Sequence, residues 1–357
     1  MSRVVALAAP RPATPRLALL GTGVVGSAFV DRYQRLRQRD LALPPLAWLG
    51  NSRALHECVE GPGRALAAAN AAPRVARMLP PWTEDVALNR GDVLVDATAS
   101  DSVADRHAQW LSRGVHVVTA NKLGVGAAAA RAQAIVAASG ESGARYGDSA
   151  TVGAGLPLLR SLRALVAGGD RIHRIEGVLS GSLAWLFNRY DGSRNFSALV
   201  REAREAGHTE PDPRVDLSGE DVRRKLLILA RAAGLALQAD AVRVESLVPP
   251  ALASLPADAV DRHLHLLDAP LSARLRRARE SDAALRLIAR IDAEGARVGL
   301  VEVSREDPLS AGAGTDNCVA IHSDRYAEQP LLIQGPGAGA EVTAAALLDD
   351  VLLISGR

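Results

Sequence analysis

The feature that most constrains this chain is the hexapeptide G-T-G-V-V-G that begins at Gly21. It directly follows the apolar run Arg16–Leu20 and opens a stretch, to about Arg37, whose apolar residues recur with helical spacing. A strand, a glycine turn and a helix in this order are typical of dinucleotide binding, because the helix N-terminus and backbone amides face the pyrophosphate. Gly21 permits the turn, Gly23 lets the backbone approach the phosphates, and Gly26 allows close helix–strand packing. An ordinary glycine turn is the alternative.

Further apolar runs predict the other strands of the same sheet, with a helix expected near Ser102–Arg113. The runs are Leu46–Gly50, Asp92–Ala97, Val115–Thr119 and Ala144–Tyr146. Short, continuously apolar strands that alternate with helices are typical of a parallel sheet covered on both faces. The sequence therefore predicts the α/β class, with a Rossmann-type doubly wound parallel sheet in a dinucleotide-binding domain over residues 16–150.

The pattern changes after residue 150. Helices are expected over Leu156–Val166, Ser197–Ala206 and Ser218–Ala233, and strands over Ile172–Ser180, Leu285–Ile291 and Val298–Val303. These elements predict a second, α+β domain over residues 151–330. Residues 331–357 hold another strand, a glycine-rich turn and a helix, which we expect to return to the first domain. Residues 1–15, which contain three prolines, are expected to form a disordered tail.

Composition excludes several classes of partner. The 42 Lys and Arg residues nearly balance the 40 Asp and Glu residues, so a net charge of +2 gives no basic footprint for nucleic acid. No apolar run is long enough for a membrane helix, which needs about 18 residues. The two cysteines cannot build a disulfide framework, which predicts a reducing, cytoplasmic environment.

The end of the second predicted strand bears on cofactor choice. Asn51, Ser52 and Arg53 follow this strand, and none of them is the carboxylate that would bind the ribose diol of NAD. A guanidinium can instead pair with the 2′-phosphate of NADP, so Arg53 favours NADP, with NAD still possible. Arg53 as a solvated loop residue is the alternative.

Two other segments hold candidate polar residues. Asp96–Ser100 and Thr119–Lys122 follow strands at the sheet edge where α/β folds bind ligands, although Lys122 as a solvated loop lysine is an equal alternative. The segment Gly207–Asp216 is rich in carboxylates and held by two prolines, which suits a site as well as an exposed acidic turn. Asp221 has two structural explanations, a capping box from Ser218 and an i,i+4 ion pair with Lys225.

Together these motifs resemble homoserine dehydrogenase. The resemblance covers residues 16–357 and is closest to the dehydrogenase half of bifunctional aspartokinase–homoserine dehydrogenases. Its most specific part is H-T-E-P-D-P-R-V-D-L-S-G-E-D-V-R-R-K at His208–Lys225. The other parts are G-T-G-V-V-G, V-D-A-T-A-S, H-V-V-T-A-N-K at His116–Lys122, V-G-A-G-L-P at Val152–Pro157, S-G-S-L at Ser180–Leu183 and G-P-G-A-G-A-E-V-T-A-A at Gly335–Ala345.

The resemblance implies roles for individual residues. Lys225 would give and take the proton at the substrate oxygen, with Asp221 and Lys122 as its catalytic partners. The residues implied to bind substrate are Glu210 and Asp216 at its ammonium group, with Asp221, Lys122, His208, Gly181 and Ser182. The residues implied to bind the cofactor are Gly21, Gly23, Val24, Val25, Gly26, Ser52, Arg53, Thr98, Ser100, Lys122 and Gly339. A monovalent-cation site for Na⁺ or K⁺ is implied at the backbone carbonyls of Val152, Ala154 and Leu156.

The implied reaction is hydride transfer from NADPH to the aldehyde carbon of L-aspartate 4-semialdehyde, which gives L-homoserine for threonine and methionine biosynthesis. A lysine ammonium would stabilise the charge that grows on the carbonyl oxygen and deliver the proton. The second domain would bind substrate and form a homodimer. No kinase region and no ACT regulatory domain are expected.

The sequence departs from the family pattern at three positions. Ser149 replaces a carboxylate before V-G-A-G, His208 replaces a tyrosine, and Val215 replaces one of two adjacent aspartates. Two other functions are considered, a dihydrodipicolinate-reductase-like enzyme and a non-catalytic NADPH-binding regulator. The segment His208–Lys225 argues against the first of these, and the joint presence of Lys122, Glu210, Asp221 and Lys225 argues against the second.

Overall fold

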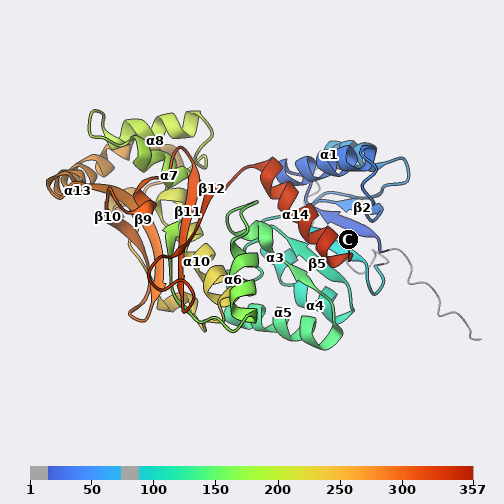
Figure 1. Ribbon diagram of the computed structural model, residues 1–357. Coiled ribbons are helices and arrows are strands. Elements are labelled where there is room, and N and C mark those ends of the chain that lie inside the picture. Colours follow the sequence, from blue (N-terminus) through green and yellow to red (C-terminus); the bar gives the residue numbers. More distant parts are fainter. Residues whose placement is uncertain (1–14, 74–87, 357) are drawn as a thin grey trace, which may run out of the picture.

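The chain forms two six-stranded sheets, each with its own helices, that lie side by side (Figure 1). The computed structural model describes residues 15–73 and 88–356. A disordered tail is expected at residues 1–15, and residues 1–14 lie outside the described residues.

The first sheet has the strand order β3-β2-β1-β4-β5-β6. Its strands are β1 (Leu17–Leu20), β2 (Leu46–Gly50), β3 (Leu55–Glu57), β4 (Val93–Asp96), β5 (His116–Thr119) and β6 (Tyr146–Gly147). Neighbouring strands pair in parallel, except that β3 runs antiparallel to β2 at the edge. The predicted Rossmann-type sheet is confirmed. The strand order changes direction between β1 and β4, which is where such sheets bind ligands beyond their carboxyl ends.

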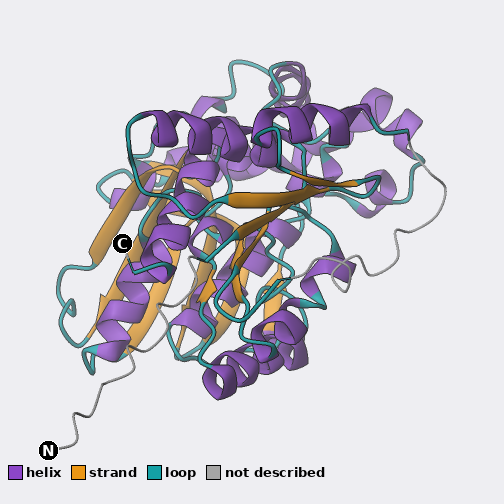
Figure 2. Cartoon of the chain, turned by 90° about the vertical axis from the view of Figure 1, so that its right-hand side faces the viewer, coloured by secondary structure: helices purple, strands orange, loops and turns teal. Residues whose placement is uncertain are grey.

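The helices of this half lie on both faces of the sheet (Figure 2). They are α1 (Val24–Gln38), α2 (Pro62–Ala71), α3 (Asp101–Ala104), α4 (His107–Ser112), α5 (Ala129–Ser142) and the 3₁₀ turn η1 (Ser149–Thr151). The single helix expected over Ser102–Arg113 is two short helices, α3 and α4, which a bend at Asp105–Arg106 separates.

The second sheet has the order β12-β11-β7-β9-β10-β8 and is antiparallel except between β10 and β8. Its strands are β7 (Ile172–Val178), β8 (Val242–Val244), β9 (Ala283–Asp292), β10 (Gly295–Ser304), β11 (Asp316–Ser323) and β12 (Leu331–Pro336). The helices that follow the first domain are α6 (Leu158–Ala167), α7 (Gly181–Arg189), α8 (Phe196–Glu205), α9 (Arg214–Leu217), α10 (Glu220–Ala232), α11 (Pro250–Ala253), α12 (Val260–His263) and α13 (Asp268–Glu280), with 3₁₀ turns at 239–241, 257–259, 264–267 and 308–310. The α+β pattern is confirmed.

Helix α10 is held by the second sheet and is important because it carries two of the candidate site residues. Helices α7, α10 and α13 all contact β9. The inward side chains of β9, such as Leu285 and Leu287, are buried in one cluster with Leu226 and Leu229 of α10. Each such leucine stabilises the fold by about 1.5–3 kcal/mol. This packing fixes the helix face that carries Asp221 and Lys225.

The C-terminal segment divides between the two sheets. Strand β12 pairs with β11 in the second sheet, and only helix α14 (Ala340–Ile354) crosses back to contact α1 and β5 (Figure 1). An ion pair of 2.6 Å between Arg35 and Glu341 joins α1 to α14. The segment 331–357 therefore returns to the first half from residue 340 onward, and not from 331.

Candidate active site

The glycine turn has the geometry that its sequence predicts. Gly21 has φ +95°, and a Cβ on this residue would lie 2.7 Å from the carbonyl oxygen of Ala97. A Cβ on Gly26 would lie 1.8 Å from the carbonyl oxygen of Gly21, so no side chain fits there. At Gly23, which precedes α1, a Cβ would meet nothing within 4 Å. This leaves open space at the helix N-terminus, beside Val24 and Val25, where a phosphate can approach.

The loop after β2 lies against this turn. The Nδ2 of Asn51 donates to the Thr22 hydroxyl (2.8 Å) and to the carbonyl of Ala69 (2.9 Å), and its Oδ1 accepts from the Arg53 amide (2.7 Å). Ser52 is exposed, and the Arg53 guanidinium makes a long contact of 3.4 Å to the carbonyl of Ala72. Asn51 thus holds Ser52 and Arg53 close to the glycine turn. The sequence alone had not indicated this role for Asn51.

The loops after β4 and β5 are joined to each other. The Asp96 carboxylate accepts from the Thr98 amide at 2.9 Å, and the Thr98 hydroxyl accepts from the Ser100 amide at 3.2 Å. Asn121 donates to the Ser100 carbonyl at 2.9 Å, which places Lys122 next to the loop that carries Thr98 and Ser100.

Lys122 and Lys225 come from different domains and share one carboxylate. The ammonium group of Lys225 lies 2.9 Å from Oδ2 of Asp221, and that of Lys122 lies 3.3 Å from Oδ1. Lys225 also donates to the carbonyl of Leu179 at 2.7 Å, and only 9% of its surface is exposed. Burial by itself raises the pKa of Asp221, but the charges and hydrogen bonds of Lys225 and Lys122 outweigh it and hold this pKa well below its usual range. Lys122 therefore forms an ion pair with the second half of the chain, and 35% of its side-chain surface stays exposed.

The capping explanation of Asp221 is wrong. Helix α10 begins at Glu220 after Gly219, which has φ +77°, so Ser218 is not its N-cap. The Ser218 hydroxyl accepts from the Glu220 amide instead, at 3.2 Å. The i,i+4 ion pair of Asp221 with Lys225 is present, but it is one part of a contact between the two domains.

The acidic loop lies next to this cluster. The Asp216 carboxylate accepts from the Glu210 amide at 2.8 Å and from the Ser182 hydroxyl. Burial, together with the negative charge of Asp221, raises the pKa of Asp216. Ser182 lies in the first turn of α7, directly after Gly181. A Cβ on Gly181 would lie 3.8 Å from Ala338, so the turn before Gly339 lies at the same place.

Other residues of the acidic loop have different surroundings. The ring of His208 lies 5.0 Å from that of Trp185, so this position packs against α7. The Asp212 carboxylate pairs with Arg214 at 2.6 Å and stays within the loop. The buried hydroxyl of Thr209 has no hydrogen-bond partner among the described residues. Val215 is 55% exposed, so the position that lost its carboxylate faces outward.

Next to the carbonyls of Val152, Ala154 and Leu156, which the resemblance implies as a monovalent-cation site, the side chains around Ser149 already include an arginine. Ser149 stands where the family has a carboxylate, and its hydroxyl donates to Asp350 at 2.8 Å. The guanidinium of Arg160 lies 3.3 Å from this hydroxyl and 3.0 Å from Asp350, so a positive charge is already present. The neighbouring Asp148 is paired with Arg163 at 2.6 Å. Within residues 15–73 and 88–356, no group of three or more His, Cys, Asp or Glu residues is arranged to hold a metal ion.

The fold and the site are those of a two-domain, NAD(P)-dependent oxidoreductase, with a glycine turn in one half and a pair of lysines where the halves meet. The sequence profile described as "Homoserine dehydrogenase" matches residues 157–352, and that described as "Homoserine dehydrogenase, NAD binding domain" matches residues 21–147. The chain therefore belongs to the homoserine dehydrogenase family.

Individual relatives agree with this assignment. The chain is 44% identical over 267 residues to the maize (Zea mays) chloroplastic bifunctional aspartokinase/homoserine dehydrogenase 2, with 74% of this chain and 29% of the maize protein covered. The chain thus spans about three tenths of the length of that relative. It is 35% identical to a homoserine dehydrogenase from Emericella nidulans, with 96% and 98% of the two chains covered. A Candida auris crystal structure described as a protein of unknown function has a TM-score of 0.84 and 33% identity, over 96% and 98% of the two chains.

Proposed function

We propose that this chain catalyses the NADPH-dependent reduction of L-aspartate 4-semialdehyde to L-homoserine. The observation that carries the proposal is the Lys122–Asp221–Lys225 cluster, which closes the junction between the dinucleotide fold and the second domain. Family membership and the segment His208–Lys225 support the same substrate. The reaction needs a proton donor and carboxylates that bind the ammonium group of the amino acid, and this segment contains both.

We assign the proton transfer to Lys225. An ammonium group has three N–H donors, and Asp221 and the Leu179 carbonyl take two of those on Lys225. The third is left for the carbonyl oxygen of the substrate. NADPH supplies the hydride, so one hydride on carbon and one proton on oxygen turn the aldehyde into an alcohol and leave NADP⁺. Lys122, on the other oxygen of Asp221, adds positive charge where the oxygen becomes negative.

Charge also explains the role we give the acidic loop. Glu210 and Asp216 bind the ammonium group of the amino acid, at the opposite end from the aldehyde. Burial disfavours the ionised form of Asp216, as its raised pKa indicates, and a bound ammonium group would compensate for this cost. Ser182 and Gly181 at the start of α7 complete this end of the site, and His208 forms its wall on Trp185.

We assign the dinucleotide to the first half, with its pyrophosphate at Gly21, Gly23 and Gly26 and its nicotinamide near Thr98, Ser100 and Gly339. NADP is the preferred form, because Arg53 lies beside the glycine turn and, among residues 15–73 and 88–356, its guanidinium makes one long contact of 3.4 Å. No monovalent cation is needed, because Arg160 supplies a positive charge beside Ser149.

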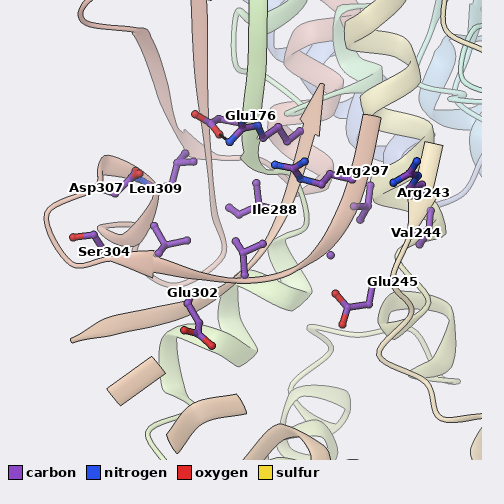
Figure 3. Close-up of a pocket in the computed structure, with 15 residues that line it drawn as sticks. Glu176, Arg243, Val244, Glu245, Ile288, Arg297, Glu302, Ser304, Asp307 and Leu309 are labelled. Carbon is purple, nitrogen blue, oxygen red and sulfur yellow. Dashed lines mark hydrogen bonds and ion pairs between the residues drawn. The ribbon is translucent and has the colours of Figure 1, made fainter. Parts of the chain in front are cut away.

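A homodimer is the proposed assembly, and the second sheet offers the surface for it. A cavity of about 510 Å³ lies on the sheet face formed by β8, β9 and β10 (Figure 3). Apolar Ile288, Val301 and Leu309 line it, and Glu176 and Arg297 place both signs of charge on the same face. Such a surface can pair with itself across a twofold axis. Sedimentation of a Val301→Glu variant should shift from dimer to monomer, and an unchanged profile would argue against this face.

The proposed location rests on the cysteines. No described helix combines the length and the apolar character needed to cross a bilayer. Cys58 and Cys318 are both free thiols. We place the enzyme in the cytoplasm, where thiols stay reduced.

The experiment that tests the reaction follows the loss of NADPH absorbance with and without L-aspartate 4-semialdehyde, and identifies homoserine by chromatography. Substrate-dependent oxidation with homoserine formed in equal amount is the expected result. Binding of NADPH without turnover would instead favour a regulator that kept only the fold.

A further inference from the structure

A chain of hydrogen bonds runs through the interior behind the cofactor loops, from the sheet edge to β4. The hydroxyl of Tyr146 lies 3.0 Å from Nδ1 of His107, and Nε2 of His107 lies 3.0 Å from Oδ2 of Asp96. The side chains of His107 and Asp96 are completely buried. These three residues come from β6, α4 and β4, and none of them belongs to the site described above as touching substrate or cofactor.

With Asp96 ionised and His107 neutral, the hydrogen bonds of this chain allow one order of the protons. A carboxylate can only accept, so Nε2 of His107 donates to Asp96. In the neutral imidazole Nδ1 is then an acceptor, and it takes the hydroxyl proton of Tyr146. Burial raises the pKa of Tyr146 well above its usual range, with the charges of Asp148 and Asp96 adding to this effect, so the phenol keeps the proton that it donates.

Asp96 also accepts hydrogen bonds from both loops that we assign to the nicotinamide side. Its Oδ1 accepts from the Thr98 amide at 2.9 Å, and its Oδ2 accepts from Asn121 at 3.0 Å. Asn121 in turn donates to the carbonyl of Ser100 and accepts from the amide of Leu123 at 3.1 Å. One buried carboxylate therefore joins the loop of Thr98 and Ser100 to the loop of Lys122.

The backbone after Lys122 also rests directly on the histidine and the tyrosine. A Cβ on Gly124 would lie 2.4 Å from the Tyr146 hydroxyl and 3.0 Å from Nδ1 of His107. A Cβ on Gly126 would lie 2.6 Å from the carbonyl of Lys122 and 3.0 Å from Ile228 on α10. The lysine loop is thus clamped between the buried hydrogen bonds and the helix that carries Lys225.

We propose that His107 is a positioning residue of the active site, which holds Asp96 so that the loops of Thr98 and Lys122 keep their places against Asp221. Its effect on turnover rests on the proposed function, whereas its effect on the loops does not. A displacement of about 1 Å in a reacting group can lower a rate about 100-fold, so a residue that touches no substrate can still control turnover.

The test compares His107→Phe with His107→Gln. Phenylalanine fills the space but removes the imidazole donor to Oδ2 of Asp96, whereas glutamine keeps an N–H for Asp96. In His107→Phe we expect kcat to fall about 10- to 100-fold, and the amides of residues 97–100 and 121–124 to exchange hydrogen faster. His107→Gln should restore most of the rate and of the protection.

Leu111→Val on the same short helix is the matched control, because Leu111 is completely buried but lies outside the hydrogen-bonded chain. It should lower the melting temperature while leaving kcat and the exchange of both loops unchanged. If Leu111→Val reproduces the loss, or if His107→Gln recovers nothing, or if His107→Phe leaves loop exchange at the wild-type rate, the positioning role is refuted. A wild-type enzyme without activity on the semialdehyde would refute the proposed reaction, and loop exchange would still decide the role of His107.

Discussion

Replacing Lys225 with methionine tests the proposed proton transfer most directly. The change removes the ammonium group but keeps a side chain of similar length on α10. Two of the three donors of Lys225 are used within the protein, by Asp221 at 2.9 Å and by Leu179 at 2.7 Å. Loss of the third, which we assign to the substrate oxygen, should lower kcat about 10²- to 10⁴-fold, the usual contribution of a positioned acid or base.

The same substitution has a cost in stability that can be separated from the effect on catalysis. It leaves the buried carbonyl of Leu179 without its donor, which should lower the free energy of unfolding by about 1–3 kcal/mol. Asp221 keeps Lys122 as a partner, so its charge remains compensated. A simple i,i+4 pair would be worth only about 0.3–0.5 kcal/mol and would leave turnover alone.

The assay measures kcat and KM with the semialdehyde under saturating NADPH, and urea unfolding on the same samples. Arg223→Ala is the control, because Arg223 also forms an ion pair on α10, with Glu220 at 2.6 Å, but lies outside the lysine cluster. It should cost some stability and no turnover. A folded Lys225→Met variant with near-normal kcat would refute the acid/base assignment.

Three further predictions concern the cofactor, the acidic loop and the cation. Arg53→Ala should weaken NADPH binding about 10- to 150-fold, for a charge-assisted contact of about 1.5–3 kcal/mol, and leave NADH binding unchanged; equal weakening of both dissociation constants would exclude phosphate recognition. The fold raises the pKa of Asp216, so the protonated carboxyl stabilises the folded state. This stabilisation is complete below the pKa of the unfolded chain, about 3.9, and is lost as the pH rises through the pKa of the folded state. Asp216→Asn should therefore gain stability relative to wild type from acid towards neutral pH, while KM for the amino acid rises; a stability difference that does not change with pH would contradict this. Exchange of NaCl for choline chloride at equal ionic strength should leave kcat unchanged, because Arg160 stands beside Ser149, and a specific loss without Na⁺ or K⁺ would overturn that reading.

The sequence by itself determined the local elements and the candidate residues of this protein. The glycine turn needs only its own backbone and the strand and helix beside it, so the residues 21–26 predicted it fully. The segment His208–Lys225 pointed to Lys225 and its neighbouring carboxylates through its resemblance to the family, whereas spacing alone left an ordinary i,i+4 ion pair open. The antiparallel pair of β9 and β10 also followed from local pattern, since two apolar runs are joined by a short turn.

Contacts between distant segments were decided only by the tertiary structure. The partner of Lys122 was set by packing, which placed this lysine 3.3 Å from Asp221, 99 positions further along the chain. The bonds from Tyr146 to His107 and on to Asp96 depend on which strands are neighbours and how α4 packs against them, which no local pattern encodes. Strand β12 lies in the second sheet, where it pairs with β11. The sequence of this strand predicted a strand but not the sheet to which it belongs. Local patterns specify elements through short-range backbone preferences, whereas such pairings depend on the burial and register of the whole chain.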